Sequence, residues 1–236
     1  MEIDFCAELE QDVRFKEGLK ACMNCGICTA ICPAAELYNY DPRSIITSVQ
    51  LRNNLQIKEL LQSETIWYCG QCMSCKTRCP RGNTPGFIIQ TLRKLSQQYG
   101  YFTHSEKGRQ QYAIKKTVGE NVLKKGYCVH PDLVSYDMHE EQGPIWEWVQ
   151  QHKQAIYDRL GANLDKEGAG ALRKIHKKNL DELQAIFDVT NGTELYTIIE
   201  EESKKQAERM NLGFSDNIDN EYFKHVYTYN SNTHSE

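Results

Sequence analysis

Two segments of this chain share the spacing C-x2-C-x2-C-x3-C-P, a pattern of metal-binding thiols. Each cysteine of the first segment has a counterpart at one constant offset in the second, so the pattern is an internal repeat. The eight cysteines are Cys22, Cys25, Cys28 and Cys32 in the first segment and Cys69, Cys72, Cys75 and Cys79 in the second. The start, MEIDFCAELEQD, is acidic and does not resemble an export signal, so dense cysteine points to metal and not to disulfides.

This spacing favours two 4Fe-4S clusters that exchange a ligand. Three cysteines spaced three positions apart can wrap a short loop around three corners of one cubane cluster, whereas the fourth reaches a neighbouring cluster. We therefore expect one cluster on Cys22, Cys25, Cys28 and Cys79. The other is expected on Cys69, Cys72, Cys75 and Cys32. The prolines that follow, Pro33 and Pro80, suit a chain leaving the cluster loop because they fix φ and lack an N–H.

Zinc is the main alternative, since paired cysteines also build zinc ribbons. Zinc sites usually separate two C-x2-C pairs by a longer gap, whereas here three ligands follow one another and end in C-P. Catalytic thiols are disfavoured because all eight cysteines belong to one repeated pattern. Cys6 and Cys128 lie outside the repeat and are expected to be structural, and Cys128 with His130 does not complete a metal site.

Composition narrows the class of protein. The net charge is -4, from 28 basic and 32 acidic residues, which gives no electrostatic case for nucleic acid as the main partner. Mean hydropathy is -0.63, and no apolar stretch approaches the roughly 20 residues that a membrane-spanning helix needs. We expect a cytoplasmic protein without a transmembrane segment. Bound clusters would bring the charge to roughly -8, which Lys20, Lys76, Arg78 and Arg81 beside the ligands could offset or present to an acidic partner.

Helical patterns dominate the rest of the chain. After each cluster a capping residue and a proline begin a helix, at Asp41-Pro42 and at Thr84-Pro85. The first helix carries apolar residues at helical spacing from Ile45 to Leu61, and Gly100 ends the second. We expect these two helices to pack together and to shield the clusters.

The fold class is therefore mostly α. Residues 1–100 form a helical two-cluster ferredoxin core, of the bacterial two-cluster ferredoxin-like (α-helical ferredoxin) type. Residues 101–143 form an irregular or helical connector whose lysines alternate with apolar residues as on a solvated helix. Residues 144–236 form a helical extension, with a helix up to Gly161, a second begun by an Asn179–Glu182 capping box, and a third over 193–211. The final residues, from Ser215, are expected to be an extended tail that orders only against a partner.

The sequence contains ligands for electron-transfer clusters but no motif for substrate binding or catalysis. It has no G-x-G-x-x-G, Walker or G-x-S-x-G motif, so no catalytic residue is expected. Adjacent cubane clusters pass single electrons, and the chain is interpreted as the electron-transfer subunit of an oxidoreductase complex.

The two cysteine segments, with Trp67-Tyr68 before Cys69 and the proline-led helix behind, resemble the C subunit of heterodisulfide reductase, most clearly over 15–100. Residues Gly168–Gly192 are similar to the corresponding C-type proteins of sulfur-oxidising, heterodisulfide reductase-like complexes. The resemblance implies electron relay between a flavin-containing A subunit and a B subunit whose paired-cysteine motifs carry the disulfide chemistry. In the sulfur-oxidising version it also implies a lipoate-binding protein as the sulfur carrier.

Two other functions stay open. The same clusters could serve another dehydrogenase or quinone-linked complex, or they could be a structural scaffold. The sequence has no adjacent Cys-Cys pair, so the disulfide chemistry of the B subunit is not expected in it, which argues against fused relatives such as glycolate oxidase iron–sulfur subunits. It also lacks the plant-type C-x4-C-x2-C spacing, which argues against the iron–sulfur protein of succinate dehydrogenase.

Overall fold

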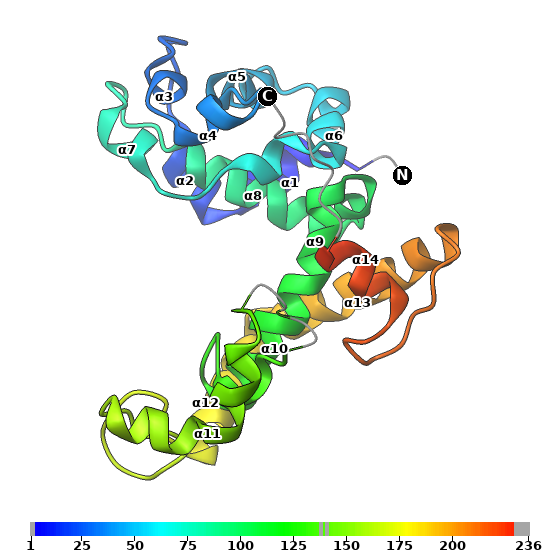
Figure 1. Cartoon of the computed structure of the whole chain (residues 1–236). Coiled ribbons are helices and arrows are strands. Elements are labelled where there is room, and N and C mark those ends of the chain that lie inside the picture. The colour runs from blue at the N-terminus through cyan, green and yellow to red at the C-terminus, as the bar shows by residue number, and fades with distance from the viewer. Residues whose placement is uncertain (1–2, 137–138, 140–141, 229–236) are drawn as a thin grey trace. The chain divides into compact units, whose positions relative to one another are not determined.

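The computed structural model describes residues 3–136, 139 and 142–228. These residues form helices and contain no strand (Figure 1), which confirms the mostly-α prediction. The chain divides into two compact units, one of Met1–Gln111 with Thr197–Glu236 and the other of Tyr112–Tyr196. The predicted division into 1–100, 101–143 and 144–236 stays a prediction.

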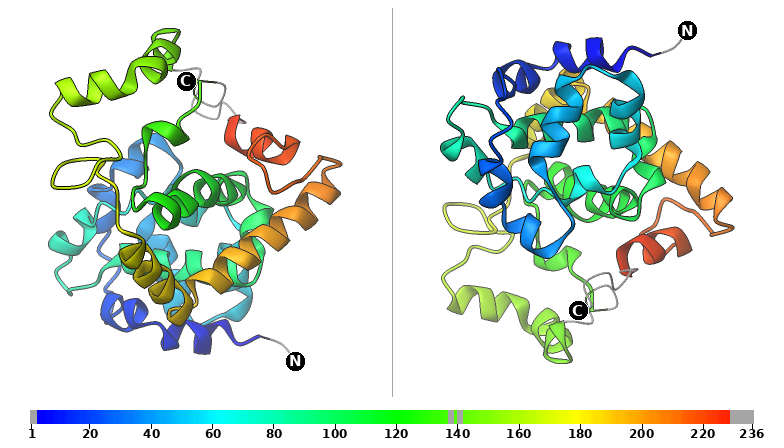
Figure 2. Two further views of the ribbon diagram at one scale, coloured as in Figure 1. Left: turned by 90° about the horizontal axis from the view of Figure 1, so that it is seen from below. Right: turned by 90° about the horizontal axis from the view of Figure 1, so that it is seen from above.

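The first unit is built around α8. Up to residue 104, its helices are α1 (Phe5–Gln11), α2 (Val13–Gly18), α3 (Ile27–Ala30), α4 (Pro33–Leu37), α5 (Pro42–Gln50), α6 (Asn54–Gln62), α7 (Ser74–Arg78) and α8 (Pro85–Gln98), with 3-10 turns at Thr65–Tyr68 and Tyr101–His104. Helix α8 contacts α1, α2, α5, α6 and α7. Its apolar side chains Ile88, Ile89, Leu92 and Leu95 are buried, and this burial is the main stabilising term of the unit. Helices α3 and α7, one from each cysteine segment, lie in contact (Figures 1 and 2).

The predicted starts of α5 and α8 are confirmed. Pro42 and Pro85 each take a first-turn position, and the Asp41 carboxylate accepts the Arg43 N–H at 2.9 Å. Gly100 follows α8 at φ +72°, in the left-handed region that ends helices. The single helix expected between the two cysteine segments is wrong. Arg52 takes φ +53° and breaks it into α5 and α6, and Asn53 caps α6.

The second unit contains a buried charge cluster that the sequence pattern did not reveal. Helix α9 (Glu106–Ile114) leads into a π-helix at Lys115–Gly119 and then α10 (Glu120–Lys125). The Lys115 and Lys116 side chains are only 8% and 7% exposed, so the solvated helix face expected there is wrong for these two lysines. Each ammonium lies 3.2 Å from the Glu120 carboxylate, which compensates its burial.

Further helices complete the described residues: a 3-10 turn at Pro131–Leu133, α11 (Ile145–Arg159), α12 (Lys177–Val189), α13 (Gly192–Arg209) and α14 (Glu221–Thr228). Helix α11 ends before Gly161, as predicted. The capping box at Asn179–Glu182 is wrong, because α12 begins at Lys177 after His176.

The extended tail expected from Ser215 is also wrong for part of its length. Residues Glu221–Thr228 form α14, whose Tyr222, Phe223 and Val226 are buried. Asn220 Oδ1 accepts the Phe223 N–H at 2.7 Å and so satisfies a free donor at the start of this helix. Burial of these three apolar side chains thus stabilises a helix, although the polar composition of the segment suggested an extended chain. The remainder of the tail, 229–236, lies outside the described residues.

Among the described residues, no helix combines the length and apolar character needed to cross a lipid bilayer.

The substitution Glu120→Gln tests the buried charge cluster. Burial raises the pKa of the Glu120 carboxyl, but the hydrogen bond from Lys124 and the charges of Lys116 and Lys115 outweigh it and lower that pKa below its ordinary 4.5. The variant leaves two buried ammonium groups without this carboxylate, so we expect the free energy of unfolding to fall by about 3 kcal/mol at neutral pH. The measurement is thermal or urea denaturation followed by circular dichroism under anoxic conditions.

Because the pKa of the folded carboxyl is depressed, the stabilisation is present above pH 4.5 and is lost as the pH falls below it. The difference between wild type and variant should shrink accordingly. Glu147→Gln on exposed α11 removes the same charge away from the lysines and is the control. Equal destabilisation by both variants would show that the cluster contributes nothing specific.

Candidate metal centre

Two cavities in the first unit gather the eight repeated cysteines in two sets. The first cavity is lined by Cys22, Cys25, Cys28 and Cys79. The second is lined by Cys32, Cys69, Cys72 and Cys75, and Cys28 also reaches it. The structure therefore brings three neighbouring cysteines of one segment together with the last cysteine of the other, although their role as ligands stays a prediction.

The two cysteine loops have the same backbone shape. Asn24 and Gln71, at equivalent positions, have φ +57° and +54°, and the next equivalent pair, Gly26 and Met73, has φ +82° and +60°. These left-handed turns aim backbone donors at sulfur, since the N–H of Asn24 and of Gln71 each lies 3.4 Å from the Sγ two residues before it. Asn24 and Gly26 are residue types that favour such turns, whereas Gln71 and Met73 gave no signal in the sequence, because Gln and Met rarely take a positive φ.

The thiols differ in how readily they ionise. Burial raises the pKa of Cys28 and of Cys75. Hydrogen bonds from the Ser74 hydroxyl and N–H lower the pKa of Cys72. Burial acts to raise the pKa of Cys79, but the N–H groups of Arg81 and Asn83 and the Asn83 side chain outweigh it and lower that pKa. Hydrogen-bond donors of the protein thus stabilise negative charge on Cys72, at the surface, and on Cys79, which lies in the cavity of the other segment.

The donor chemistry fits iron–sulfur clusters. The first cavity offers four thiols and the second five, counting the shared Cys28, and no His, Asp or Glu is among the described residues that line either one. Small and apolar residues make up much of both walls, including Gly26 and Pro80 in the first and Gly86 and Ala34 in the second, and Arg43 and Arg81 add positive charge to the first. A Cβ on Gly86 would lie 2.9 Å from Met73 Sδ, so glycine keeps this wall open. Sulfur ligands with small neighbours and backbone donors are typical of cubane sites.

Comparison with known proteins gives the same result. Residues 18–83 match the family described as 4Fe-4S dicluster domain. The chain is 34% identical over 173 residues to the C subunit of the ferredoxin:CoB-CoM heterodisulfide reductase of Methanosarcina acetivorans, covering 73% of this chain and 62% of that protein. It is 32% identical over 140 residues to the C subunit of the ferredoxin/F420H2-dependent CoB-CoM heterodisulfide reductase of the same organism, covering 58% and 79%.

This chain belongs to the C-subunit family of heterodisulfide reductases. Its cofactors are two 4Fe-4S clusters, as the dicluster match and the cysteine spacing indicate. A further member, the iron–sulfur C subunit of the CoB–CoM heterodisulfide reductase of Methanopyrus kandleri, is 31% identical over 118 residues, 48% of this chain. The aligned region spans 62% of the length of the first Methanosarcina acetivorans relative and 60% of the length of the Methanopyrus kandleri relative.

In this C-subunit family protein, Arg93 on α8 holds the second cysteine loop. Its guanidinium donates to three backbone carbonyls, those of Ile66 at 2.7 Å, Trp67 at 2.9 Å and Cys69 at 2.7 Å. It also lies over the Trp67 ring, 5.4 Å from the centroid. The role of Arg93 could not be predicted from the sequence, because an arginine on a helix gives no sign of which distant carbonyls it reaches.

The remaining predicted residues lie away from the cavities or at their rims. Cys25 and Cys72, which are equivalent in the repeat, are exposed, so each cavity has one thiol at the surface. Lys76, Arg78 and Arg81 are also exposed, as is Lys20. Cys6 is half-buried on α1, whereas Cys128 is exposed, which does not fit the packing role expected of it.

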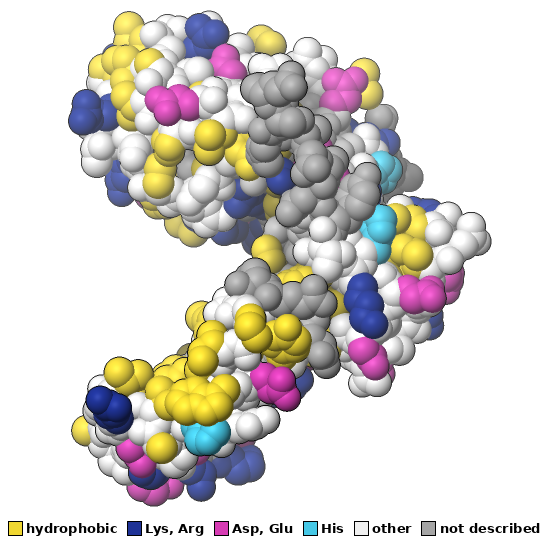
Figure 3. Space-filling view, viewed as in Figure 1, with side chains coloured by type: hydrophobic (Ala, Val, Ile, Leu, Met, Phe, Trp, Pro, Cys, Tyr) yellow, Lys and Arg dark blue, Asp and Glu magenta, His cyan; other side chains and the backbone are white. Residues whose placement is uncertain are grey.

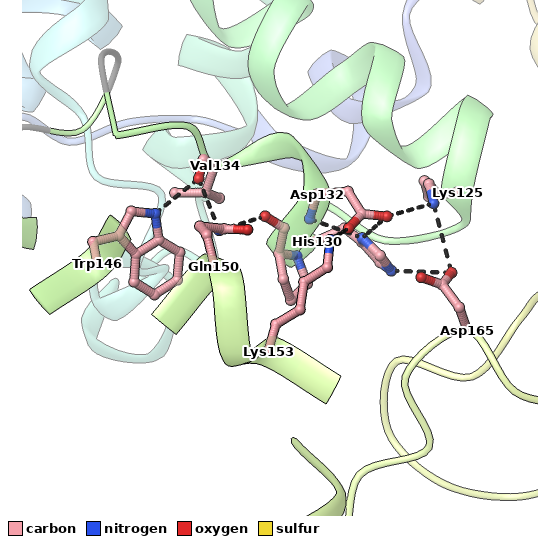
Figure 4. Close-up of polar contacts among 9 residues, drawn as sticks. Lys125, His130, Asp132, Val134, Trp146, Gln150, Lys153 and Asp165 are labelled. Atoms are coloured by element: carbon pink, nitrogen blue, oxygen red, sulfur yellow. Dashed lines mark hydrogen bonds and ion pairs between the residues drawn. The ribbon is translucent and has the colours of Figure 1, made fainter. Parts of the chain in front are cut away.

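His130 belongs to a polar network of the second unit (Figure 4). It is 1% exposed, and its ring lies 3.6 Å from Asp132 and 3.5 Å from Asp165. Lys125 pairs with both carboxylates, and Lys153 with Asp132. Burial and the Lys125 charge lower the pKa of His130. Because ammonium groups already satisfy the carboxylates, we read this network as structural.

The substitution Arg93→Lys tests the support of the second cysteine loop. A lysine keeps the charge but cannot donate in a fixed fork to three carbonyls, and each buried carbonyl left unpaired costs about 1–3 kcal/mol. We expect a lower melting temperature and loss of iron, up to half of the total, on gel filtration. Lys94→Arg, one residue along α8, is the control, because Lys94 bonds Asp12 instead. Full iron retention in Arg93→Lys would contradict the assigned role.

Proposed function

We propose that this chain is an electron-transfer subunit that relays single electrons through two neighbouring 4Fe-4S clusters in a heterodisulfide reductase-like complex. When bound, each cluster takes up and releases one electron at a time. The observation that carries the proposal is the shared wall of the two cavities: Cys28 and Pro85 line both. Clusters separated by one layer of side chains can exchange electrons without a further cofactor.

The ligand sets belong to the same proposal. Cys22, Cys25, Cys28 and Cys79 hold one cluster, and Cys69, Cys72, Cys75 and Cys32 hold the other. The cavity linings and the contact between α3 and α7 support this crossed arrangement. The exposed thiols, Cys25 and Cys72, put one corner of each cluster at the surface. Electrons would arrive at one of these corners and leave at the other.

We further propose that the partners are a flavin-containing protein like the A subunit of the family and a protein like its B subunit, whose paired-cysteine motifs carry the disulfide chemistry. The similarity of Gly168–Gly192 to sulfur-oxidising relatives supports a sulfur-oxidising complex, with a lipoate-binding protein as sulfur carrier. An apolar surface of the second unit supports protein partners. Ile145 and Trp148 of α11 are 62% and 50% exposed, and Figure 3 shows apolar side chains gathered over this part of the molecule.

The substitution Cys79→Ser tests the crossed ligands. We expect it to damage the cluster whose other ligands are Cys22, Cys25 and Cys28, although Cys79 belongs to the second segment. The wild type should contain about eight iron atoms per chain, and the variant should lose up to half. Electron paramagnetic resonance of the reduced protein identifies the damaged cluster when the spectrum is compared with those of Cys22→Ser and Cys69→Ser.

If the Cys79→Ser spectrum matches that of Cys69→Ser instead, the crossed assignment fails. Zinc in the purified wild type, or about four iron atoms, would contradict the two-cluster proposal itself. The Cys128→Ser variant is the matched control, because this cysteine lies outside both cavities, and it should keep all the iron.

Affinity purification from anoxic cells tests the partners. We expect two co-purifying chains, one with a flavin absorption spectrum and one with adjacent cysteine pairs, both identified by mass spectrometry. Replacing exposed Ile145 and Trp148 with serine should weaken their recovery without changing the iron content. Recovery of quinone-linked dehydrogenase proteins instead would assign the same clusters to a different complex.

A further inference from the structure

Two buried polar side chains have hydrogen-bond donors that face the thiols of the cysteine cavities. Tyr40 is 4% exposed and Asn83 is 2% exposed. Among the described residues, neither the Tyr40 hydroxyl nor the Asn83 Nδ2 makes a hydrogen bond of good geometry. The acceptors within their reach are cysteine thiols, since the Asn83 side chain acts to lower the pKa of Cys79, and Tyr40 interacts with Cys69. Leaving a buried donor unpaired costs about 1–3 kcal/mol, so sulfur in these cavities is the partner that both donors fit.

Both side chains line the cysteine cavities. Asn83 lines the first cavity, and Tyr40 lines the second. They also occupy equivalent positions, because each comes two residues before the proline that begins its helix, Pro42 for α5 and Pro85 for α8. Each follows the last cysteine of its own segment, Cys32 or Cys79, and lies with that cysteine in the same cavity.

The surroundings fix how the Asn83 amide points. Its Oδ1 accepts the Lys20 N–H at 2.6 Å, and its own backbone N–H lies 3.2 Å from Cys79 Sγ. With the oxygen engaged, the amide leaves its NH2 group as the free donor at the cavity wall. Tyr40 is held by packing, since its ring meets the Tyr68 ring edge-on at 6.3 Å.

We propose that the segment after each cysteine loop, 32–40 or 79–83, contributes both a thiolate ligand and a buried hydrogen-bond donor to the cluster of the other loop. The donor bonds to sulfur. Tyr40 serves the cluster of the second cavity, and Asn83 serves that of the first. This inference rests on the proposed two-cluster relay and adds the residues that tune it. Both are tuning residues and not ligands.

The donors set the reduction potentials. A hydrogen bond to a cluster sulfur stabilises the more negative, reduced state and so raises the potential. Burial strengthens this effect, because no water competes for the sulfur. The two donors differ, a phenol O–H in the second cavity and an amide N–H in the first. Cations lie near both sites, Arg43 and Arg81 in the lining of the first cavity and Arg93 at the Cys69 carbonyl beside the second. Each donor is therefore assigned to the cluster whose cavity it lines.

The test compares Tyr40→Phe with Asn83→Leu. We expect two midpoints in an anoxic redox titration of the wild type, followed by electron paramagnetic resonance. Tyr40→Phe should shift one midpoint to a more negative value and leave the other in place, while Asn83→Leu should shift the other midpoint. In D2O, the exchangeable proton coupled to the reduced cluster should disappear from the electron–nuclear double resonance spectrum of the wild type and be missing from each variant.

Tyr68→Phe is the matched control, because it removes a hydroxyl one residue from Cys69 but outside both cavity linings. If Asn83→Leu does not fold, Asn83→Asp keeps the oxygen that accepts from Lys20 and still removes the donor. About eight iron atoms in every variant with unmoved midpoints, or a Tyr68→Phe shift equal to that of Tyr40→Phe, would overturn this inference alone. A wild type without two clusters would overturn the proposed function instead.

Discussion

The organisation of the first unit depends on how the last cysteine of each segment, Cys32 or Cys79, reaches the cavity of the other segment. The last cysteine of each segment follows its third by only four positions and leads into a proline, so it extends away from its own loop. In the structure Cys79 lies with the 22–28 loop and Cys32 with the 69–75 loop. Neither cavity is complete unless both segments are folded against each other. Cluster binding and tertiary folding are therefore coupled in this unit.

The same crossing explains the arrangement of the helices. After the last cysteine of each segment the chain enters α5 or α8 at a proline, and these two helices pack together. Helix α8 then supplies the apolar core on one side and Arg93 on the other, so that a single helix supports both the fold and the second cysteine loop. Two clusters with four thiolates each add about -4 to the chain. The cations and backbone donors near the cavities are suited to offsetting this charge.

Much of this could be predicted from the sequence, because ligand spacing and helix capping are local signals. The repeat predicted which cysteines would meet, and Asp41-Pro42 and Thr84-Pro85 predicted where two helices begin. Long-range contacts were missed. Nothing local in the sequence relates Arg93 to the Trp67 carbonyl. Lys116 and Glu120 have the local i,i+4 spacing of a helical ion pair, but that spacing does not show that the lysine is buried. Local composition also misled at α14, where Tyr222 and Phe223 are buried in a segment whose neighbours are polar.

The most direct test of the account is anomalous diffraction at the iron edge from crystals grown under anoxic conditions. The account predicts two iron-containing peaks of equal strength in the first unit, each bridging both cysteine segments, with Cys79 bonded to the peak at the 22–28 loop. A peak bonded to four cysteines of one segment, or signal at the zinc edge instead of the iron edge, would contradict it.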